Sequence, residues 1–272
     1  MKKFLALSLL VLTFFASTAS AEVVVGRHSM LNFTEAELVK LMQESINRDF
    51  YVGLDVTSIS LKYYDSLVLL QLALDKGEIG VMTLPMCVGQ FVLHSNPNYT
   101  IKGLDWWFLS SACTFNCAFL ESNKELQGRF NEAIKDMKDK GVLVLLEEKY
   151  INNLDVNNIA PIEIPKFDDA PTITVAVTGD MPPIDYIAPD GTPAGYNTAV
   201  LSEIGKRLHV NIKLENIDTG ARAAALQSGR VDVVFWFQSN LDSNIPAIDV
   251  PEGIILSEPY YKWNEQYFIG KK

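Results

Sequence analysis

The apolar positions of this chain repeat one unit twice. Residues Ala73–Val81 and Ala225–Val233 share the pattern Ala-Leu-x-x-Gly-x-(Ile/Val)-x-Val. In each copy an apolar run, Leu67–Leu74 or Ala221–Leu226, leads to a glycine and then to a short β-rich segment. Glycine just after the last helical turn favours a left-handed cap, so both copies predict helix, glycine, strand. The repetition predicts two similar α/β lobes that hold a ligand between them.

The first half contains signals for one strand and three more helices. The β-branched run Val23–Val25 predicts a strand, and Thr34 with Glu37 forms a capping box that starts a helix. Apolar side chains recur at helical spacing over residues 122–140, and residues 143–150 predict a final short helix.

A polar segment at residues 152–170, punctuated by prolines, interrupts the pattern and predicts a connector. We place the lobe boundary there, with residues 22–160 as one lobe and 161–272 as the other. The second lobe is expected to begin with a strand, a helix and a strand, at residues 173–177, 197–208 and 211–215. Alternating strands and helices favour parallel pairing in both lobes.

Residues 1–21 have the pattern of a cleaved secretory signal. Lys2 and Lys3 precede a short apolar run, and Ala19-Ser20-Ala21 matches the small-residue cleavage site. We expect an exported, periplasmic protein without a lipid anchor, since no cysteine lies near that site. The formal net charge of the whole chain is −10, which argues against nucleic acid and anionic membranes as partners.

The three cysteines are Cys87, Cys113 and Cys117. If Cys113 and Cys117 share a strand, about 13 Å separates them, which is too far for a disulfide. A pairing through Cys87 stays open, and buried free thiols are the expected state. The absence of paired Cys/His spacing argues against a zinc site, and neither a metal nor a cofactor is expected.

The second half carries a series of motifs in a familiar order. They are Ile173–Pro183, Asp190-Gly191, Ala194–Asn197, Leu226–Asp232 and Leu256–Tyr261. With this spacing, residues 172–261 resemble the first lobe of the family 3 extracellular solute-binding proteins, which serve amino-acid importers of the ABC type. The resemblance implies the two-lobed α/β fold of periplasmic binding proteins (type II, Venus-flytrap), with mixed sheets flanked by helices.

The first half resembles the second lobe of the same family through shorter motifs. They are Tyr64-Asp65-Ser66, Ala73–Gly77, Glu125-Leu126, Asp139–Gly141 and Glu148–Ile151. The lobe order is therefore reversed. Two explanations are open: a circular permutation with residues 268–272 at one hinge end, or a remnant of two tandem binding domains. Chain length and the complementary halves favour permutation.

The resemblance implies a cleft beyond the carboxyl ends of the strands. The family pairs the ligand carboxylate with an arginine after the Val-Asp-Val-Val strand, and the ammonium with a second-lobe acid. This chain has no arginine from Gln238 to Gly253, and Gly80 stands where the acid is expected. Arg222 at the opening of a helix is the replacement candidate for a carboxylate or phosphate, the alternative being a solvated charge.

Other candidates follow from strand-end positions. Trp236 is expected either in the core or in the cleft, where it could stack on a planar ligand, whereas Phe235 is expected in the core. Asp180 could hold an amine or cap its turn, and the family places an aromatic near Tyr186. The remaining strand-end candidates are Arg27, Ser29, Thr83, Gln238 and Ser239. His28 has no evident partner in the sequence.

The sequence thus predicts a monomeric solute-binding protein that delivers a small polar solute, such as an amino acid, to a membrane ABC permease, without covalent chemistry. One alternative is an enzyme on the same fold, similar to dehydratases of prephenate-like acids, with Asp180 as its only plausible acid. Others are a sensor ectodomain without a transport role and a degenerate copy that binds nothing.

Overall fold

The computed structural model describes residues 23–28, 59–102, 112–156, 161–188, 190–240, 250–263 and 266–272. The helix expected at Thr34, residues 157–160 of the connector and the signal segment lie outside these residues. Within them, no helix combines the length and the apolar character needed to cross a membrane.

The repeated unit folds the same way in both copies. Helix α2 (Leu67–Lys76) is followed by Gly77 with φ 76°, and α7 (Arg222–Gln227) is followed within two residues by Gly229 with φ 70°. In both copies the amide after the glycine donates to the carbonyl of the repeat's first alanine, at 2.9 and 3.0 Å. This is the hydrogen bonding of a left-handed helix cap, so the predicted helix–glycine–strand unit is confirmed twice.

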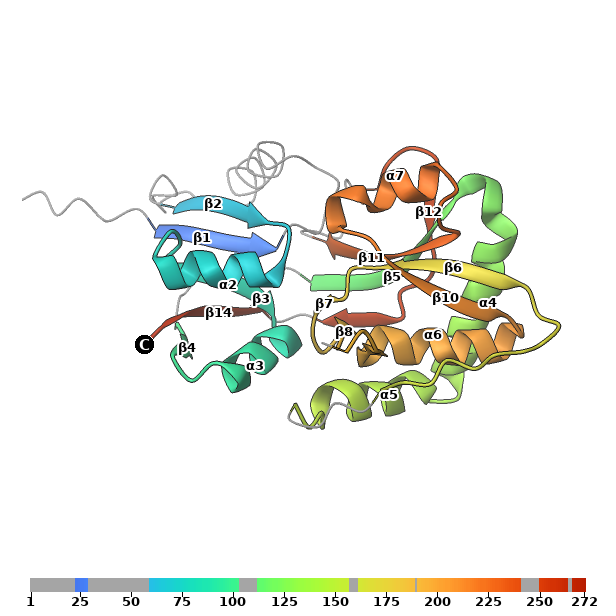
Figure 1. The fold of residues 1–272 in the computed structure, drawn as a ribbon, viewed down its shortest axis with the longest axis horizontal. Helices are drawn as coiled ribbons and strands as arrows, with labels where there is room; N and C mark the ends of the chain where they lie inside the picture. The colour runs from blue at the N-terminus through green and yellow to red at the C-terminus, as the bar shows by residue number, and fades with distance from the viewer. Residues whose placement is uncertain are drawn as a thin grey trace, which may run out of the picture.

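The smaller lobe is built on a sheet of order β2-β1-β3-β14-β4 (Figure 1). Its strands are β1 (Val23–His28), β2 (Ile59–Tyr64), β3 (Val81–Pro85), β4 (Tyr99–Ile101) and β14 (Gln266–Lys271). The first three strands of the order are parallel, and β14 runs antiparallel to both β3 and β4. Helices α2 and α3 (Met86–Ser95) pack on this sheet.

The larger lobe contains a sheet of order β10-β6-β11-β5-β12, with β13 also paired to β5. Its strands are β5 (Ala112–Leu120), β6 (Thr172–Val177), β10 (Asn211–Asn216), β11 (Val233–Asn240), β12 (Ile254–Leu256) and β13 (Tyr261–Trp263). Beside it lies a small sheet of β7 (Asp180–Met181), β8 (Asp185–Ile187) and β9 (Pro193–Ala194).

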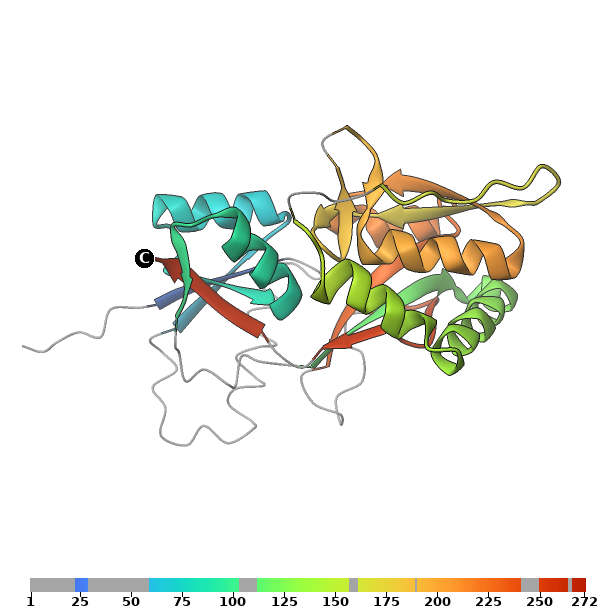
Figure 2. The same ribbon diagram turned by 90° about the horizontal axis from the view of Figure 1, so that it is seen from below.

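Helices surround the larger sheet (Figures 1 and 2). Besides α7 they are α4 (Lys124–Asp139), α5 (Val142–Glu147) and α6 (Gly195–Leu208), with the short turns η3 (Glu121–Asn123), η4 (Glu148–Asn152) and η5 (Thr219–Ala221). The neighbouring residues Val233 and Val234 of β11 are both 0% exposed, so this strand is covered on both faces. The expected mixed sheets flanked by helices are thus confirmed.

The division between the two sheets differs from the expected boundary at residues 160 and 161. Strand β5 precedes the connector, yet it pairs antiparallel with β11 over residues 112–118, and α4 and α5 pack against α6. Strand β14 follows the connector but pairs with β3 in the smaller lobe. The connector pattern marked a surface segment of one lobe, because long-range strand pairing, which the sequence pattern does not reveal, decides lobe membership.

The chain passes between the lobes twice, after β4 and after β13. The strands that flank these passages within the larger lobe are neighbours, because Trp263 of β13 pairs with Cys113 of β5. Two adjacent passages are the arrangement that lets two lobes rotate about a shared hinge.

Two of the three thiols are confirmed as buried and free. Cys87 and Cys117 are not in a disulfide, and burial raises the pKa of each to about 12. Such thiols are protonated at neutral pH and unreactive. The side chain of Cys113 lies outside the described part of the structure.

The start of α6 depends on a glycine that no other residue replaces easily. Gly195 has φ 86°, and an added Cβ would lie 2.7 Å from the carbonyl oxygen of Pro183. We predict that Gly195→Ala lowers the free energy of unfolding by about 2–3 kcal/mol in chemical denaturation.

Gly128 in the interior of α4 supplies the matched control, since its added Cβ would meet nothing within 4 Å. Gly128→Ala should raise stability by about 0.5–1 kcal/mol. Equal effects of the two substitutions would contradict the assignment of a special backbone role to Gly195.

Candidate functional site

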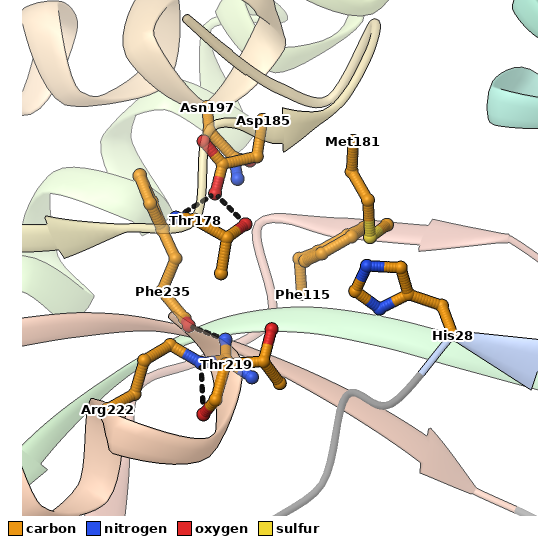
Figure 3. Close-up of a pocket in the computed structure, with 9 residues that line it drawn as sticks. All are labelled: His28, Phe115, Thr178, Met181, Asp185, Asn197, Thr219, Arg222 and Phe235. Carbon is orange, nitrogen blue, oxygen red and sulfur yellow. Dashed lines mark hydrogen bonds between the residues drawn. The ribbon is translucent and has the colours of Figure 1, made fainter. Parts of the chain in front are cut away.

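The strand ends of the two lobes face one another across a small cavity. Strand β1 ends at His28 and points toward the larger lobe, in which β6 ends just before Thr178 (Figures 1 and 3). The cavity wall is formed by His28, Phe115, Thr178, Met181, Asp185, Asn197, Thr219, Arg222 and Phe235. About 20 Å³ is open to water-sized molecules. That space suits one or two waters, so a larger solute enters only when the lobes separate.

Arg222 brings a positive charge to the cavity wall. It is the first residue of α7 and only 5% exposed. Its Nε donates to the carbonyl of Thr219 at 3.3 Å, and its Nη1 donates to the carbonyl of Phe235 at 2.8 Å. The guanidinium carbon lies 5.5 Å from the ring centre of Trp236. These contacts fix a planar, permanently charged group in one orientation, which suits the recognition of an oxyanion.

Asp185 is a buried carboxyl group on the opposite part of the wall (Figure 3). Its Oδ2 accepts hydrogen bonds from the backbone amide and the hydroxyl of Thr178, both at 2.9 Å. Burial raises the pKa of Asp185, and the nearby charge of Asp180 adds to this, while the Thr178 hydrogen bonds oppose it. The carboxyl group therefore holds the turn after β6 in place.

Asn197 presents an amide to the same cavity. It lies in the first turn of α6, is 1% exposed, and its Oδ1 accepts from the hydroxyl of Tyr260 at 2.9 Å. Its Nδ2 is buried and has no hydrogen-bond partner among the described residues. A buried amide donor without a partner is costly, which marks it as a group that a ligand can satisfy.

A hydrogen bond joins the two lobes beside the cavity. His28 Nε2 of β1 lies 3.2 Å from Asp180 Oδ2 of β7, and the His28 side chain is 2% exposed. Burial favours a raised pKa for Asp180, but the hydrogen bond and charge of His28, with contributions from Thr178 and the amide of Leu67, outweigh it and lower the pKa. Asp180 is therefore ionised at neutral pH and accepts a hydrogen bond from His28 Nε2.

Of the candidates from the sequence, Arg222 is on the cavity wall and Asp180 is next to it. Tyr186 lies between the lobes, with its ring 6.4 Å from that of Phe91 on α3, outside the cavity wall. Trp236 is 0% exposed and belongs to the core, whereas Phe235 lines the cavity. The expectation that Phe235 belongs to the core is confirmed, since it is 3% exposed, and it also borders the cavity, which lies on its face of β11.

The candidate residues of the smaller lobe that the structure describes do not lie on the cavity wall. Arg27 alternates with His28 along β1 and so points to the other face. It pairs in register with Thr83, which is 4% exposed and has a buried hydroxyl without a hydrogen-bond partner in the described structure. Ser29 and the side chains of Gln238 and Ser239 lie outside the described residues.

Gly80 is not a position from which an acid could reach the cavity. Its amide donates to the carbonyl of Val24, near the start of β1, whereas His28 at the end of that strand faces the cavity. Positions at the other end of β3, from Thr83 to Pro85, are nearer to the opposing lobe.

Sequence reasoning missed several wall residues. His28 and Asn197 are 169 positions apart and share no local motif, so only the folded chain brings them together. Asn197 is the last residue of the Ala194–Asn197 motif, and this position in a family motif is the signal in the sequence that could have identified it as a wall residue. Among the described residues, no group of three or more His, Cys, Asp or Glu side chains is gathered for a metal ion.

Residues 173–270 match the family of bacterial extracellular solute-binding proteins, family 3. The resemblance to this family is therefore confirmed over that part of the chain. A comparison with curated protein sequences gave no match.

Three solved structures show similarity at low sequence identity. The ligand-binding component of an ABC-type import system from Staphylococcus aureus, with zinc bound, is 9% identical, with coverage of 92% of this chain and 65% of that one and a TM-score of 0.42. The alkanesulfonate-binding protein SsuA from Xanthomonas axonopodis pv. citri, bound to MOPS, is 10% identical, with 93% and 66% coverage and a TM-score of 0.42. The GluR0 ligand-binding core from Nostoc punctiforme, in complex with L-glutamate, is 12% identical, with 91% and 83% coverage and a TM-score of 0.37. The chain thus spans about two thirds of the length of the first two.

The His28–Asp180 bond predicts a pH-dependent term in stability. Because the folded-state pKa of Asp180 is lowered, its contribution is present above the ordinary aspartate pKa of about 4 and is lost as the pH falls through the lower folded value. A double-mutant cycle with His28→Gln and Asp180→Asn should give a coupling of about 1–2 kcal/mol at pH 5 that declines as the pH falls below about 4.

The exposed pair Lys135–Asp139 is the control for this cycle, with a Nζ–Oδ2 distance of 2.6 Å on one helix face. Its coupling should be smaller, since exposed ion pairs are screened by solvent. A His28–Asp180 coupling no larger than that of the control would show that the bond does not hold the lobes together.

Proposed function

We propose that the protein is an extracytoplasmic solute-binding protein that closes two lobes over a small polar solute and delivers it to an ABC importer. The observation that carries the proposal is the cavity between the lobes. Both lobes line it, His28 from one and Arg222 with Asn197 from the other. A buried cation and a buried amide donor at the meeting point of two hinged lobes are features of a ligand site.

The mechanism follows from the two chain passages. Rotation about them opens the cavity to solvent, and a solute first contacts the larger lobe, which supplies most of the wall. Closure then brings His28 against the bound solute and excludes water, which strengthens the polar contacts inside. The solute favours the closed form because it binds that form more tightly than the open one. The closed form is then the state that a membrane permease would recognise.

Arg222 is the proposed grip for the solute. It takes the role of the family arginine that is missing between residues 238 and 253, but from the start of α7. A guanidinium with backbone carbonyls on Nε and Nη1 is already oriented, so little entropy is lost when it binds a carboxylate. The carboxylate of an amino acid or a related solute fits the oriented guanidinium, and we propose a periplasmic monomer that acts without covalent chemistry.

One observation favours a second candidate, an enzyme with a dehydratase-like activity. The His28–Asp180 pair supplies the base and orienting carboxylate that acid–base chemistry needs next to a cavity. Incubation with prephenate-like acids and detection of products decides the matter. Turnover that is lost in His28→Gln would favour the enzyme, and its absence leaves binding as the function.

We predict that a thermal-shift screen over amino acids, polyamines and small organic acids finds a stabilising solute. A ligand at a hundred times its Kd stabilises by about 2.7 kcal/mol, which corresponds to a Tm rise of about 5–10 °C in a protein of this size. Arg222→Gln keeps a hydrogen-bond donor near the two backbone carbonyls but removes the charge. It should abolish the shift for an anionic solute.

Arg230→Gln is the control, since Arg230 forms an exposed ion pair with Glu215 at 2.5 Å and is not on the cavity wall. It should leave the shift unchanged. Small-angle scattering with the stabilising solute should show a decrease in the radius of gyration. A protein that no small solute in the panel stabilises or compacts would contradict the proposal.

A further inference from the structure

The cavity wall is rich in hydrogen-bond donors and in positive charge. Arg222 contributes its guanidinium, and Asn197 contributes a buried Nδ2 that has no hydrogen-bond partner in the described structure. Thr219, which is 1% exposed, contributes its hydroxyl group. These groups come from η5, α7 and α6 and line one cavity, with Arg222 and Thr219 on one side of it and Asn197 on the other, beside Asp185 (Figure 3). Donors of this kind bind the oxygens of an anion.

Each carboxylate near the cavity is engaged through its Oδ2, and Asp180 Oδ1 is buried without a hydrogen-bond partner among the described residues. Asp185 accepts two hydrogen bonds from Thr178 that hold the turn, and Asp180 accepts one from His28. Asp180 is also outside the cavity wall, where the amide of Leu67 at the start of α2 acts on its carboxylate. On the cavity wall an ammonium group would thus lose its water and meet only Asp185, whose Oδ2 is already engaged by Thr178, beside the fixed charge of Arg222.

His28 offers the smaller lobe's contribution. Its Nδ1 is buried and has no hydrogen-bond partner among the described residues. Because ionised Asp180 only accepts, Nε2 carries the proton of that bond, and Nδ1 is left for a solute group, as an acceptor in the neutral ring or a donor in the protonated ring. A hydroxyl group donates to such a nitrogen, and the protonated imidazole would donate to an oxo oxygen.

The remaining wall is apolar. Phe115 and Met181 lie beside His28, and Phe235 lies on the other side of Thr178 and Thr219 (Figure 3). Such side chains favour a hydrocarbon or aromatic body on the solute over a second charged group, because a second charge would be desolvated without a partner.

We infer that the solute is a small 2-hydroxy or 2-oxo monocarboxylate with an apolar side chain, rather than an α-amino acid. The inference rests on the proposed solute-binding function and names its substrate class. The carboxylate is bound by Arg222 and Asn197, the hydroxyl or oxo oxygen faces His28, and the apolar side chain contacts Phe115 and Met181.

The test uses pairs of compounds that differ only at the second carbon. Isothermal titration of the full protein compares 2-hydroxyisocaproate and 2-oxoisocaproate with leucine, and phenyllactate and phenylpyruvate with phenylalanine. The hydroxy or oxo acid of a pair should bind at least tenfold more tightly than its amino acid. Arg222→Gln should weaken that binding by at least tenfold, and Arg230→Gln should leave it unchanged.

Asn197→Asp is the decisive variant, because it has the same shape and keeps the Oδ1 that accepts from Tyr260. It converts the buried donor Nδ2 into a carboxylate oxygen. The variant should lose at least tenfold in affinity for the hydroxy or oxo acid and should gain affinity for the matched amino acid. Circular dichroism and the thermal midpoint of the variant without solute establish that it is folded.

Each outcome has one meaning. Amino acids that bind more tightly than their hydroxy and oxo counterparts, with loss in Asp180→Asn, would overturn the inference but support the solute-binding function. Equal binding within every pair would overturn the inference too, since the site would not discriminate between substituents on the second carbon. If no compound of either class binds and the wider panel is also negative, the solute-binding proposal fails with it.

Discussion

The antiparallel pairing of β5 with β11 is the constraint on which the two-lobed arrangement depends. It joins residues 112–118 to residues 234–240, and it brings the chain back from the smaller lobe into the larger sheet. One passage between the lobes ends at β5 and the other begins after β13. Because β13 pairs with β5, the two passages reach the larger lobe at adjacent strands. This pairing places Phe115 and Phe235, from segments 120 residues apart, on one wall of the cavity.

The cavity contains buried polar groups, and the free-energy cost of removing them from water is compensated in different ways. Asp185 and Arg222 are satisfied in part by backbone and hydroxyl groups, which orient them. Asn197 Nδ2 and His28 Nδ1 are buried without hydrogen-bond partners among the described residues, which costs about 1–3 kcal/mol for each group. A folded protein retains such groups when they serve a ligand, and their position on opposing lobes couples the satisfaction of both to closure.

Local signals in the sequence predicted the local structure well. The helix–glycine–strand repeats, the strand at residues 172–177 and the helix at residues 195–208 follow from periodicity and caps. The lobe boundary did not follow, because β5 and β14 are assigned to a lobe by partners more than 100 positions away. The site shows the same division. Arg222 was found from its place at a helix start, whereas the choice between Phe235 and Trp236 depended on which face of β11 the cavity occupies.

The reversed order of the family motifs leaves the cavity unaffected for a geometric reason. Strand β1 enters and β14 leaves the smaller sheet at the same end of β3, since β1 runs parallel to it and β14 antiparallel (Figures 1 and 2). That end is opposite to His28, which lies five residues, about 16 Å, along β1 from Val23. A connection made or opened there changes no wall residue and neither passage between the lobes. Connections at an end of a sheet that lies far from the functional site are the ones a fold tolerates most easily, so the reversed motif order is compatible with an unchanged cavity.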